Sequence, residues 1–202
     1  MKYLRWLTEI TPPWPEGGPF DLFTVDLPLR WTGWSPKGEG HSPQRHYPTI
    51  EPPSLIRLLR PMLAGVIAKH CISAWWVYGP RLPDTLRVIR ECGFTFTTEL
   101  FAWEKEGGFG TGLTTRKGIE NMWGAKRGKG VPICDHSVDQ RVFAPRGEHS
   151  QKPDSVYRCL ERLYGNVKRL ELFGTKLRPG WTVWGHVKGS EFVARLEERG
   201  LL

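Results

Sequence analysis

The sequence FDLFTVD at residues 20–26 decides the fold, because it is a short apolar run that ends in a carboxylate. A run that is apolar on both faces is typical of a strand buried inside a parallel sheet. Two similar runs follow, CISAWWVY at residues 71–78 and KRLELF at residues 168–173. Ligands of open α/β sheets bind beyond the carboxyl ends of the strands. We therefore expect functional residues at the ends of these three runs, beginning with Asp26.

Helical patterns alternate with these strands. Residues 52–64 repeat Leu and Met at helical spacing, and Gly93 ends a second amphipathic pattern. Strands that alternate with helices predict a single α/β domain with a doubly wound, mostly parallel sheet. Further helices are expected at 83–92, 153–163 and 190–199, and further strands at 94–103 and 141–144. The expected divisions are an N-terminal extension at 1–19, the domain at 20–188 and a C-terminal helix at 189–202.

Two segments lack a hydrophobic period. Residues 27–49 are rich in Gly, Pro, Ser and charged residues and are expected to form a long functional loop. Residues 107–131 are rich in glycine and positive charge. Such a stretch suits contact with a nucleic-acid backbone, and it equally suits a solvated surface hairpin.

Composition and charge narrow the class of protein. The net charge of +8 and the pI near 9.5 favour a polyanionic partner. No apolar run approaches the roughly eighteen residues of a membrane span. The four cysteines are scattered, without a CxxC pair, which argues against a zinc module and for reduced thiols. We expect no metal site, no membrane segment and a cytoplasmic location.

Five short sequence fragments occur in a characteristic order along the chain. They are VDLPLRW, FAWEK, EHSQKPD, LELF and PGWTVWG, between residues 25 and 185. This set resembles the adenine-N6 methyltransferase family, which includes the catalytic subunit of the mRNA adenosine methyltransferase and many bacterial and phage DNA methyltransferases. The resemblance implies a Rossmann-like fold with circularly permuted motifs, in which the catalytic motif comes first and the cofactor-binding strand comes near the C-terminus.

The resemblance also implies a reaction and partners. The reaction is transfer of a methyl group from S-adenosylmethionine to the exocyclic nitrogen of adenine. We expect DNA as the substrate, with RNA as the alternative. A bacterial or phage origin is expected, as is a homodimer or a heterodimer with a related methyltransferase subunit.

The catalytic tetrapeptide of the family is Asp-Pro-Pro followed by an aromatic residue. Here it is Asp26-Leu27-Pro28-Leu29. The family role of Asp26 and of the Leu27 carbonyl is to accept hydrogen bonds from the adenine amine, so that its lone pair is exposed to the methyl group. Leu29 lacks the π face that stacks on the base, an interaction worth about 1–3 kcal/mol. Trp31 or Trp34 is a candidate substitute.

The resemblance assigns further residues to the cofactor and to nucleic acid, and the charge of residues 107–131 adds basic nucleic-acid candidates. Glu171 is expected to accept hydrogen bonds from the ribose, and Lys105 to pair with the methionine carboxylate. The remaining cofactor candidates are Asp26, Phe173, Thr175 and His186. The nucleic-acid candidates are Trp31, Trp34, Lys37, Arg45, His46, Tyr47, Arg116, Lys117, Glu120, Lys126 and Arg127.

Alternatives remain open at this point. Asp26 also fits a residue that merely ends a strand or caps a turn, and Glu171 and Lys105 also fit solvated surface charges. Leu29, Thr175 and His186 depart from the family pattern, which favours a catalytically silent nucleic-acid-binding homologue that supports an active methyltransferase subunit. A methyltransferase for cytosine N4 is a third and weaker reading.

Overall fold

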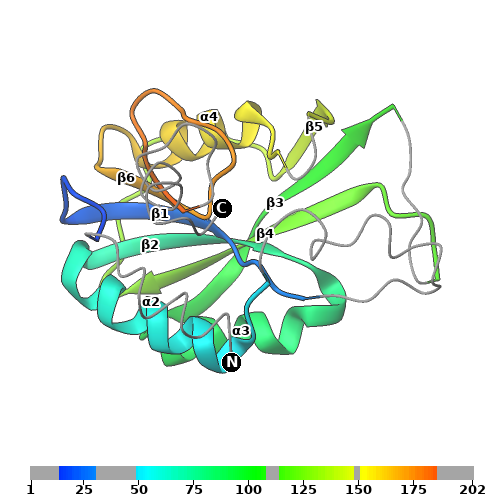
Figure 1. Ribbon diagram of the computed structural model, residues 1–202. Coiled ribbons are helices and arrows are strands. Elements are labelled where there is room, and N and C mark those ends of the chain that lie inside the picture. The colour runs from blue at the N-terminus through cyan, green and yellow to red at the C-terminus, as the bar shows by residue number, and fades with distance from the viewer. Residues whose placement is uncertain (1–13, 31–48, 108–113, 148–150, 186–202) are drawn as a thin grey trace.

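The computed structural model describes residues 14–30, 49–107, 114–147 and 151–185. Within them the chain forms one seven-stranded sheet in the order β5-β3-β4-β2-β1-β6-β7 (Figure 1). The strands β1 (Phe20–Asp26), β2 (Ile67–Val77) and β6 (Arg169–Leu172) lie side by side and parallel. The predicted strand at residues 20–26 is confirmed with its bounds, and its carboxyl end lies in the middle of the sheet.

Strand β4 (Ile119–Arg127) corrects the expectation for residues 107–131. It lies between β2 and β3 (Thr95–Glu106) and is antiparallel to both. Residues 119–127 are therefore a strand inside the sheet, neither a flexible basic stretch nor a solvated hairpin. Met122 and Ala125 are fully buried, but glycine and the basic residues around them hid the strand pattern.

The remaining neighbours in the sheet are parallel. Strand β5 (Arg141–Pro145) pairs with β3, and β7 (Thr182–Trp184) pairs with β6. The sheet is therefore mostly parallel, as predicted, and β4 supplies both of its antiparallel pairings.

Helices cover both faces of the sheet, which confirms the doubly wound α/β architecture. Helices α2 (Pro52–Val66) and α3 (Leu82–Glu91) lie on one face, and α4 (Asp154–Tyr164) lies on the other (Figure 1). A short 3-10 turn, η3 (Gly79–Arg81), joins β2 to α3. The helix expected at residues 190–199 falls outside the described residues. None of the described helices is long and apolar enough to cross a membrane.

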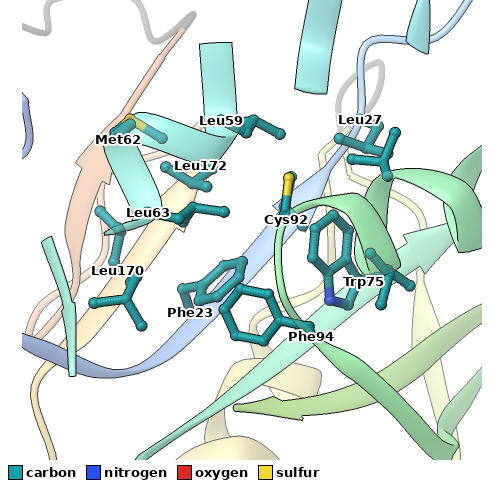
Figure 2. Close-up of a cluster of buried hydrophobic side chains, with 14 of the residues drawn as sticks. Phe23, Leu27, Leu59, Met62, Leu63, Trp75, Cys92, Phe94, Leu170 and Leu172 are labelled. Carbon is teal, nitrogen blue, oxygen red and sulfur yellow. The ribbon is translucent and has the colours of Figure 1, made fainter. Parts of the chain in front are cut away.

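Two apolar clusters hold these layers together. Between the sheet and helices α2 and α3, the rings of Phe23, Trp75 and Phe94 meet edge to face, with centroids 5.2 to 6.4 Å apart (Figure 2). On the α4 side, Leu22 packs in a second cluster. Alternation along β1 thus sends Phe23 to one core and Leu22 to the other. The same alternation places Asp26 on the α4 side.

Candidate active site

Asp26 ends β1 and meets a lysine from a distant part of the chain. Its carboxylate lies 3.0 Å from Nζ of Lys152, and 36% of its side chain is exposed. The pKa of Asp26 lies above its ordinary value because the surrounding protein removes water from the carboxylate. The charge of Lys152 opposes this shift, and the negative charge of Glu120 adds to it.

Glu120 extends this pair into a line of four alternating charges. Its carboxylate contacts Nζ of Lys152 at 2.9 Å and Nζ of Lys105 at 2.5 Å. Because β4 runs antiparallel, Glu120 near its start lies beside the carboxyl end of β2. Desolvation alone would raise the pKa of Glu120, but the two lysines hold it well below its ordinary range. The two carboxylates correspondingly raise the pKa of Lys152 against the effect of its burial.

Three aromatic rings lie under the lysines of the site. Lys152 lies 5.0 Å from the ring centroid of Trp76, and Lys105 lies 5.0 Å from that of Trp103. Both indoles are almost fully buried. Lys117 lies 4.6 Å from the ring centroid of Tyr78, which is only half-buried. Burial lowers the pKa of Lys117, and the charges of Lys105 and Lys152 add to that effect.

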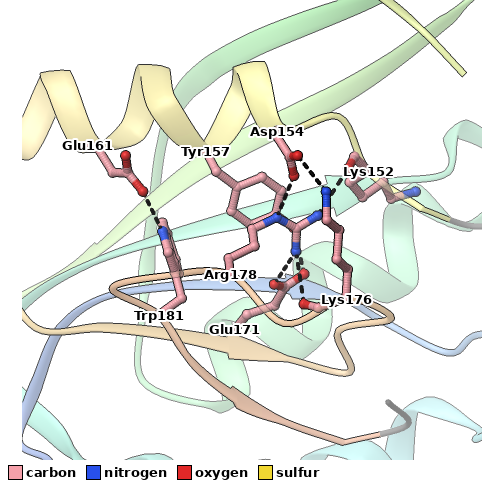
Figure 3. A network of polar contacts seen from close by, with 8 residues as sticks. All are labelled: Lys152, Asp154, Tyr157, Glu161, Glu171, Lys176, Arg178 and Trp181. Carbon is pink, nitrogen blue, oxygen red and sulfur yellow. Dashed lines mark hydrogen bonds and ion pairs between the residues drawn. The ribbon is translucent and has the colours of Figure 1, made fainter. Parts of the chain in front are cut away.

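Glu171 is held by two protein groups. It points from β6 toward α4, where the Tyr157 hydroxyl donates to one carboxylate oxygen at 2.6 Å and Arg178 to the other at 2.5 Å (Figure 3). Glu171 is 5% exposed. Desolvation raises its pKa, against the effect of Arg178 and Tyr157. The ribose expected at Glu171 would have to share these oxygens, so its role there stays a prediction.

Arg178 connects this second network to the first. Its guanidinium donates to Asp154 at 3.1 Å and to the backbone carbonyl of Lys152 at 3.0 Å, and it stacks on the ring of Tyr157 at 3.6 Å. Figure 3 shows this fork between the loop that precedes β7 and the start of α4. Sequence reasoning missed Arg178 and Tyr157, although Arg178 directly precedes the quoted fragment PGWTVWG.

Lys152 was also missed as a site residue. The sequence suggested only that it lies near the start of a helix, and α4 does begin two residues later. Its position in the fragment EHSQKPD was the available signal.

The carboxyl end of β6 holds a strained backbone. Phe173 has a φ of 58°, which is uncommon for a residue with a bulky side chain. Its amide donates to the Trp184 carbonyl at 2.6 Å, and the two rings pack at 5.8 Å. Strain of this kind gathers at ligand sites, so Phe173 stays a cofactor candidate. Thr175 lies exposed in the loop that follows, and His186 lies outside the described residues.

The rest of the tetrapeptide points away from the charged cluster. Leu27 and Leu29 are 9% and 7% exposed and belong to the core below α2 and α3. The Leu29 amide donates to the Leu27 carbonyl at 2.7 Å, and the Pro28 carbonyl accepts from Ile50 at 2.8 Å. In this conformation Leu29 faces the core, and the carbonyl predicted to meet the adenine amine already accepts one hydrogen bond.

The basic candidates separate in space. Arg116 and Lys117 lie before β4, near the charged cluster. Lys126 and Arg127 lie at the other end of β4, beside Ile72 and Cys71. The nine positions from Lys117 to Lys126 correspond to about 30 Å of extended chain, so the two pairs lie toward opposite ends of β4. The lid candidates Trp31, Trp34, Lys37, Arg45, His46 and Tyr47 lie outside the described residues.

Two buried polar groups, one under Lys152 and one three residues after it in the sequence, suit a polar ligand. Nε1 of Trp76 and Oγ of Ser155 have no hydrogen-bond partner within the described part of the chain. Trp76 lies under Lys152, and Ser155 is in the first turn of α4. Buried donors are normally satisfied, so a bound molecule with a carboxylate or hydroxyl fits this donor set. The described residues hold no group of three His, Cys, Asp or Glu side chains that would bind a metal.

Comparison with known proteins agrees with this arrangement. The model of the MT-A70 family matches residues 64–187. The type II methyltransferase M.MunI of Mycoplasma sp is 27% identical over 175 residues, which cover 86% of this chain and 73% of that protein.

Proposed function

The chain belongs to the MT-A70 family of adenine-N6 methyltransferases, and on this premise we propose that it methylates the N6 amino group of adenine in DNA, with S-adenosylmethionine as methyl donor. One observation carries the proposal. Asp26 stands at the carboxyl end of the central parallel strand, partly exposed, within a buried cluster of lysines and carboxylates. This is the edge at which doubly wound sheets bind their ligands.

Asp26 has the central role in this proposal. Bound S-adenosylmethionine supplies an electrophilic methyl group. The Asp26 carboxylate accepts a hydrogen bond from the adenine amine and fixes its orientation, which is the kind of help that a weak nucleophile needs. The methylated nitrogen gives up one proton to the carboxylate or to solvent, which needs no strong base, so a fixed acceptor with a partly desolvated carboxylate suffices.

Lys152 is the residue we assign to the carboxylate of the cofactor. It is a nearly buried cation beside Asp26, the ring of Trp76 lies under it, and the Nε1 donor of that ring has no partner within the described residues. We infer this role for Lys152 rather than for Lys105, because Lys105 contacts Glu120 on the side away from Asp26. Glu171 and Phe173 remain our candidates for the ribose and base of the cofactor.

Tyr78 adds a candidate platform for the target base. It follows β2 by one residue, on the same side of the sheet as Trp76, which pairs with Asp26 in register. Lys117 acts electrostatically on Asp26 and also lies against the Tyr78 ring, so the ring and the carboxylate share one neighbour. Tyr78 thus joins Trp31 and Trp34 as a substitute for the missing aromatic residue.

DNA is the preferred substrate in this proposal. The net charge of +8 supports a polyanionic partner, and the relative M.MunI is named as a type II methyltransferase.

The proposed location is the cytoplasm. All four cysteines are free thiols, which suits this reducing compartment.

The test is a methyl-transfer assay with radiolabelled S-adenosylmethionine, followed by mass spectrometry of the nucleosides. Duplex DNA, single-stranded DNA and RNA of the same adenine-containing sequence serve as substrates. We expect N6-methyladenine in DNA from the wild-type chain, formed at least about a hundredfold more slowly by Asp26→Asn. Methylcytosine as the product would contradict the proposal, and methylation of RNA alone would contradict the choice of DNA.

A second candidate function is a catalytically silent subunit that binds nucleic acid and supports an active methyltransferase. The burial of Leu29 in the core and the occupied oxygens of Glu171 favour it. Isothermal titration with S-adenosylmethionine separates the two functions. Micromolar binding that weakens in Lys152→Met supports the enzyme, whereas no binding to the folded chain supports the silent subunit.

A further inference from the structure

A basic hollow lies at the end of the sheet opposite Asp26. Its volume is about 480 Å³. It is lined by Arg60 and Ala64 of α2, by the end of α3 from Arg90 to Gly93, and by Arg127 of β4. Arg127, the last residue of β4, pairs with Cys71 in the first half of β2, about 20 Å along β4 from Glu120. The hollow is thus remote from the proposed reaction.

Positive charge dominates this hollow. Its lining has three guanidinium groups and one carboxylate, that of Glu91, so two positive charges are in excess. Within the described residues, none of the three arginines forms an ion pair with a carboxylate. Arg127 is fixed by a hydrogen bond to the Leu63 carbonyl at 3.2 Å and by the ring of Phe94 at 4.7 Å. Its remaining N–H donors are available to a ligand.

Capping of α3 does not account for these arginines. The Gly93 amide donates to the Arg90 carbonyl at 3.0 Å, and the Phe94 amide donates to the Ile89 carbonyl at 3.1 Å. Gly93 has a φ of +84°, as the left-handed residue of such a cap requires. Backbone amides therefore already satisfy the last carbonyls of the helix.

The charges of Arg60 and Arg127 both act on one buried group, the thiol of Cys92. Burial raises the pKa of the Cys92 thiol to about 12, and the charges of Arg127 and Arg60 both act against that shift. Two side chains from different elements thus act on the same point in the lining of the hollow.

The side chains that line the hollow indicate which kind of ligand it binds. The guanidinium fork matches the geometry of phosphate, and no aromatic residue in the lining offers a face for a base. We propose that this hollow binds backbone phosphates of nucleic acid, as a second contact that holds the polymer independently of its sequence. This goes beyond the proposed function by adding a remote site, and it rests on that function for the nature of the polymer.

The test compares two double variants of the full chain by fluorescence anisotropy with a labelled DNA duplex over a series of salt concentrations. Arg60→Gln with Arg90→Gln removes two charges of the hollow. Arg87→Gln with Arg158→Gln removes two exposed charges of α3 and α4 outside it. We expect the first pair to weaken binding roughly tenfold and to reduce the slope of log K against log salt by nearly 2, since each phosphate contact contributes about 0.9. Equal slopes for the two pairs would overturn the proposal.

Two further arms complete the test. Inorganic phosphate is titrated at constant ionic strength, and binding of phosphate without any effect of the first pair on DNA affinity would reduce the hollow to a small-anion site and overturn the proposal. Methyl transfer to a short oligonucleotide is measured in parallel. If no form of the chain transfers a methyl group, the proposed function fails, whereas the difference in DNA affinity between the two pairs still decides the remote site.

Discussion

Asp26 is both ion-paired and partly exposed, and the two properties have separate consequences. It is paired with Lys152 at 3.0 Å, and more than a third of its side chain is exposed at the edge of the sheet. The lysine keeps the carboxylate in place, while the exposure leaves it accessible to a substrate amine. Leu29, three residues later, is buried in the core and has no such access.

Replacement of Asp26 tests its role as acceptor. We expect Asp26→Asn to lower kcat for methyl transfer at least about a hundredfold, because an amide is a weaker and differently arranged acceptor. Lys152 keeps its contact with Glu120, so the fold should persist. Radiolabel transfer to DNA measures the effect, with Asp84→Asn, which breaks a surface pair with Arg81, as control. A loss of less than about threefold would exclude Asp26 from the reaction.

The ion pairs of Glu120 should make the stability of the chain depend on pH. The pKa of Glu120 in the folded chain is lowered from an ordinary 4.5, so its ion pairs contribute stability that is present above about pH 4.5 and lost as the pH falls below it. We expect Glu120→Gln to lower the free energy of unfolding at neutral pH. The difference from the wild type should shrink as the pH falls toward 3.

Urea unfolding at about pH 7, 5 and 3 measures this difference. A difference that stays constant over the range would show that the ionised carboxylate does not stabilise the fold.

At the scale of elements, Arg178 joins the loop before β7 to the start of α4. Its loss leaves Glu171 as a buried carboxylate without a charge partner, which costs about 3–5 kcal/mol. We therefore expect Arg178→Ala to reduce the free energy of unfolding by that amount and to weaken cofactor binding, since Lys152 loses the bond to its carbonyl.

Lys176→Ala is the matched control for Arg178→Ala. Lys176 contacts the same Asp154 from a position where 39% of its side chain is exposed, so its removal should cost less than about 1 kcal/mol. Denaturant unfolding and calorimetric titration measure both variants. Equal losses for the two would contradict the anchoring role of Arg178.

The junction of β6 and β7 depends on Gly185. A Cβ atom there would lie 2.6 Å from Cα of Phe173, and the φ of Gly185 is +124°. We expect Gly185→Ala to push the two strands apart at the proposed cofactor edge. It should cost more than the about 1–2 kcal/mol of a left-handed alanine alone.

Gly107→Ala provides the comparison. Gly107 also has a positive φ, of +82°, but a Cβ atom there would meet nothing within 4 Å. Thermal unfolding of both variants separates the clash from the backbone strain. Similar losses of thermal stability in the two variants would show that the backbone of Phe173 can move away from the added Cβ atom.

At the scale of the whole molecule, the two cores share one sheet. Leu59 of α2 and Leu160 of α4 are both fully buried on opposite faces. We expect Leu59→Ala and Leu160→Ala each to cost about 2–5 kcal/mol and each to shift a single cooperative transition. Urea unfolding followed by tryptophan fluorescence and by circular dichroism checks this. Two separate transitions would contradict the single domain predicted from the sequence.

The features that depend on local sequence pattern could be predicted from the sequence alone. The buried strand β1, the helices at α2, α3 and α4, and the acid at the end of β1 follow from short-range periodicity and turn residues. The ordered fragments were enough to indicate the family. Periodicity reports burial along one segment, so these features needed no knowledge of the partners of that segment.

Only the tertiary structure decided which charges meet. Strand β4 was hidden because its pairing with β2 and β3 lies in contacts between distant segments, and its glycine and basic residues weaken the local signal. That antiparallel strand brings Glu120 to Lys152 and carries Arg127 to the opposite end of the sheet. Arg178 and Lys152 likewise gain their roles from long-range contacts. A single sequence records the side chains of such contacts but not the distances between them.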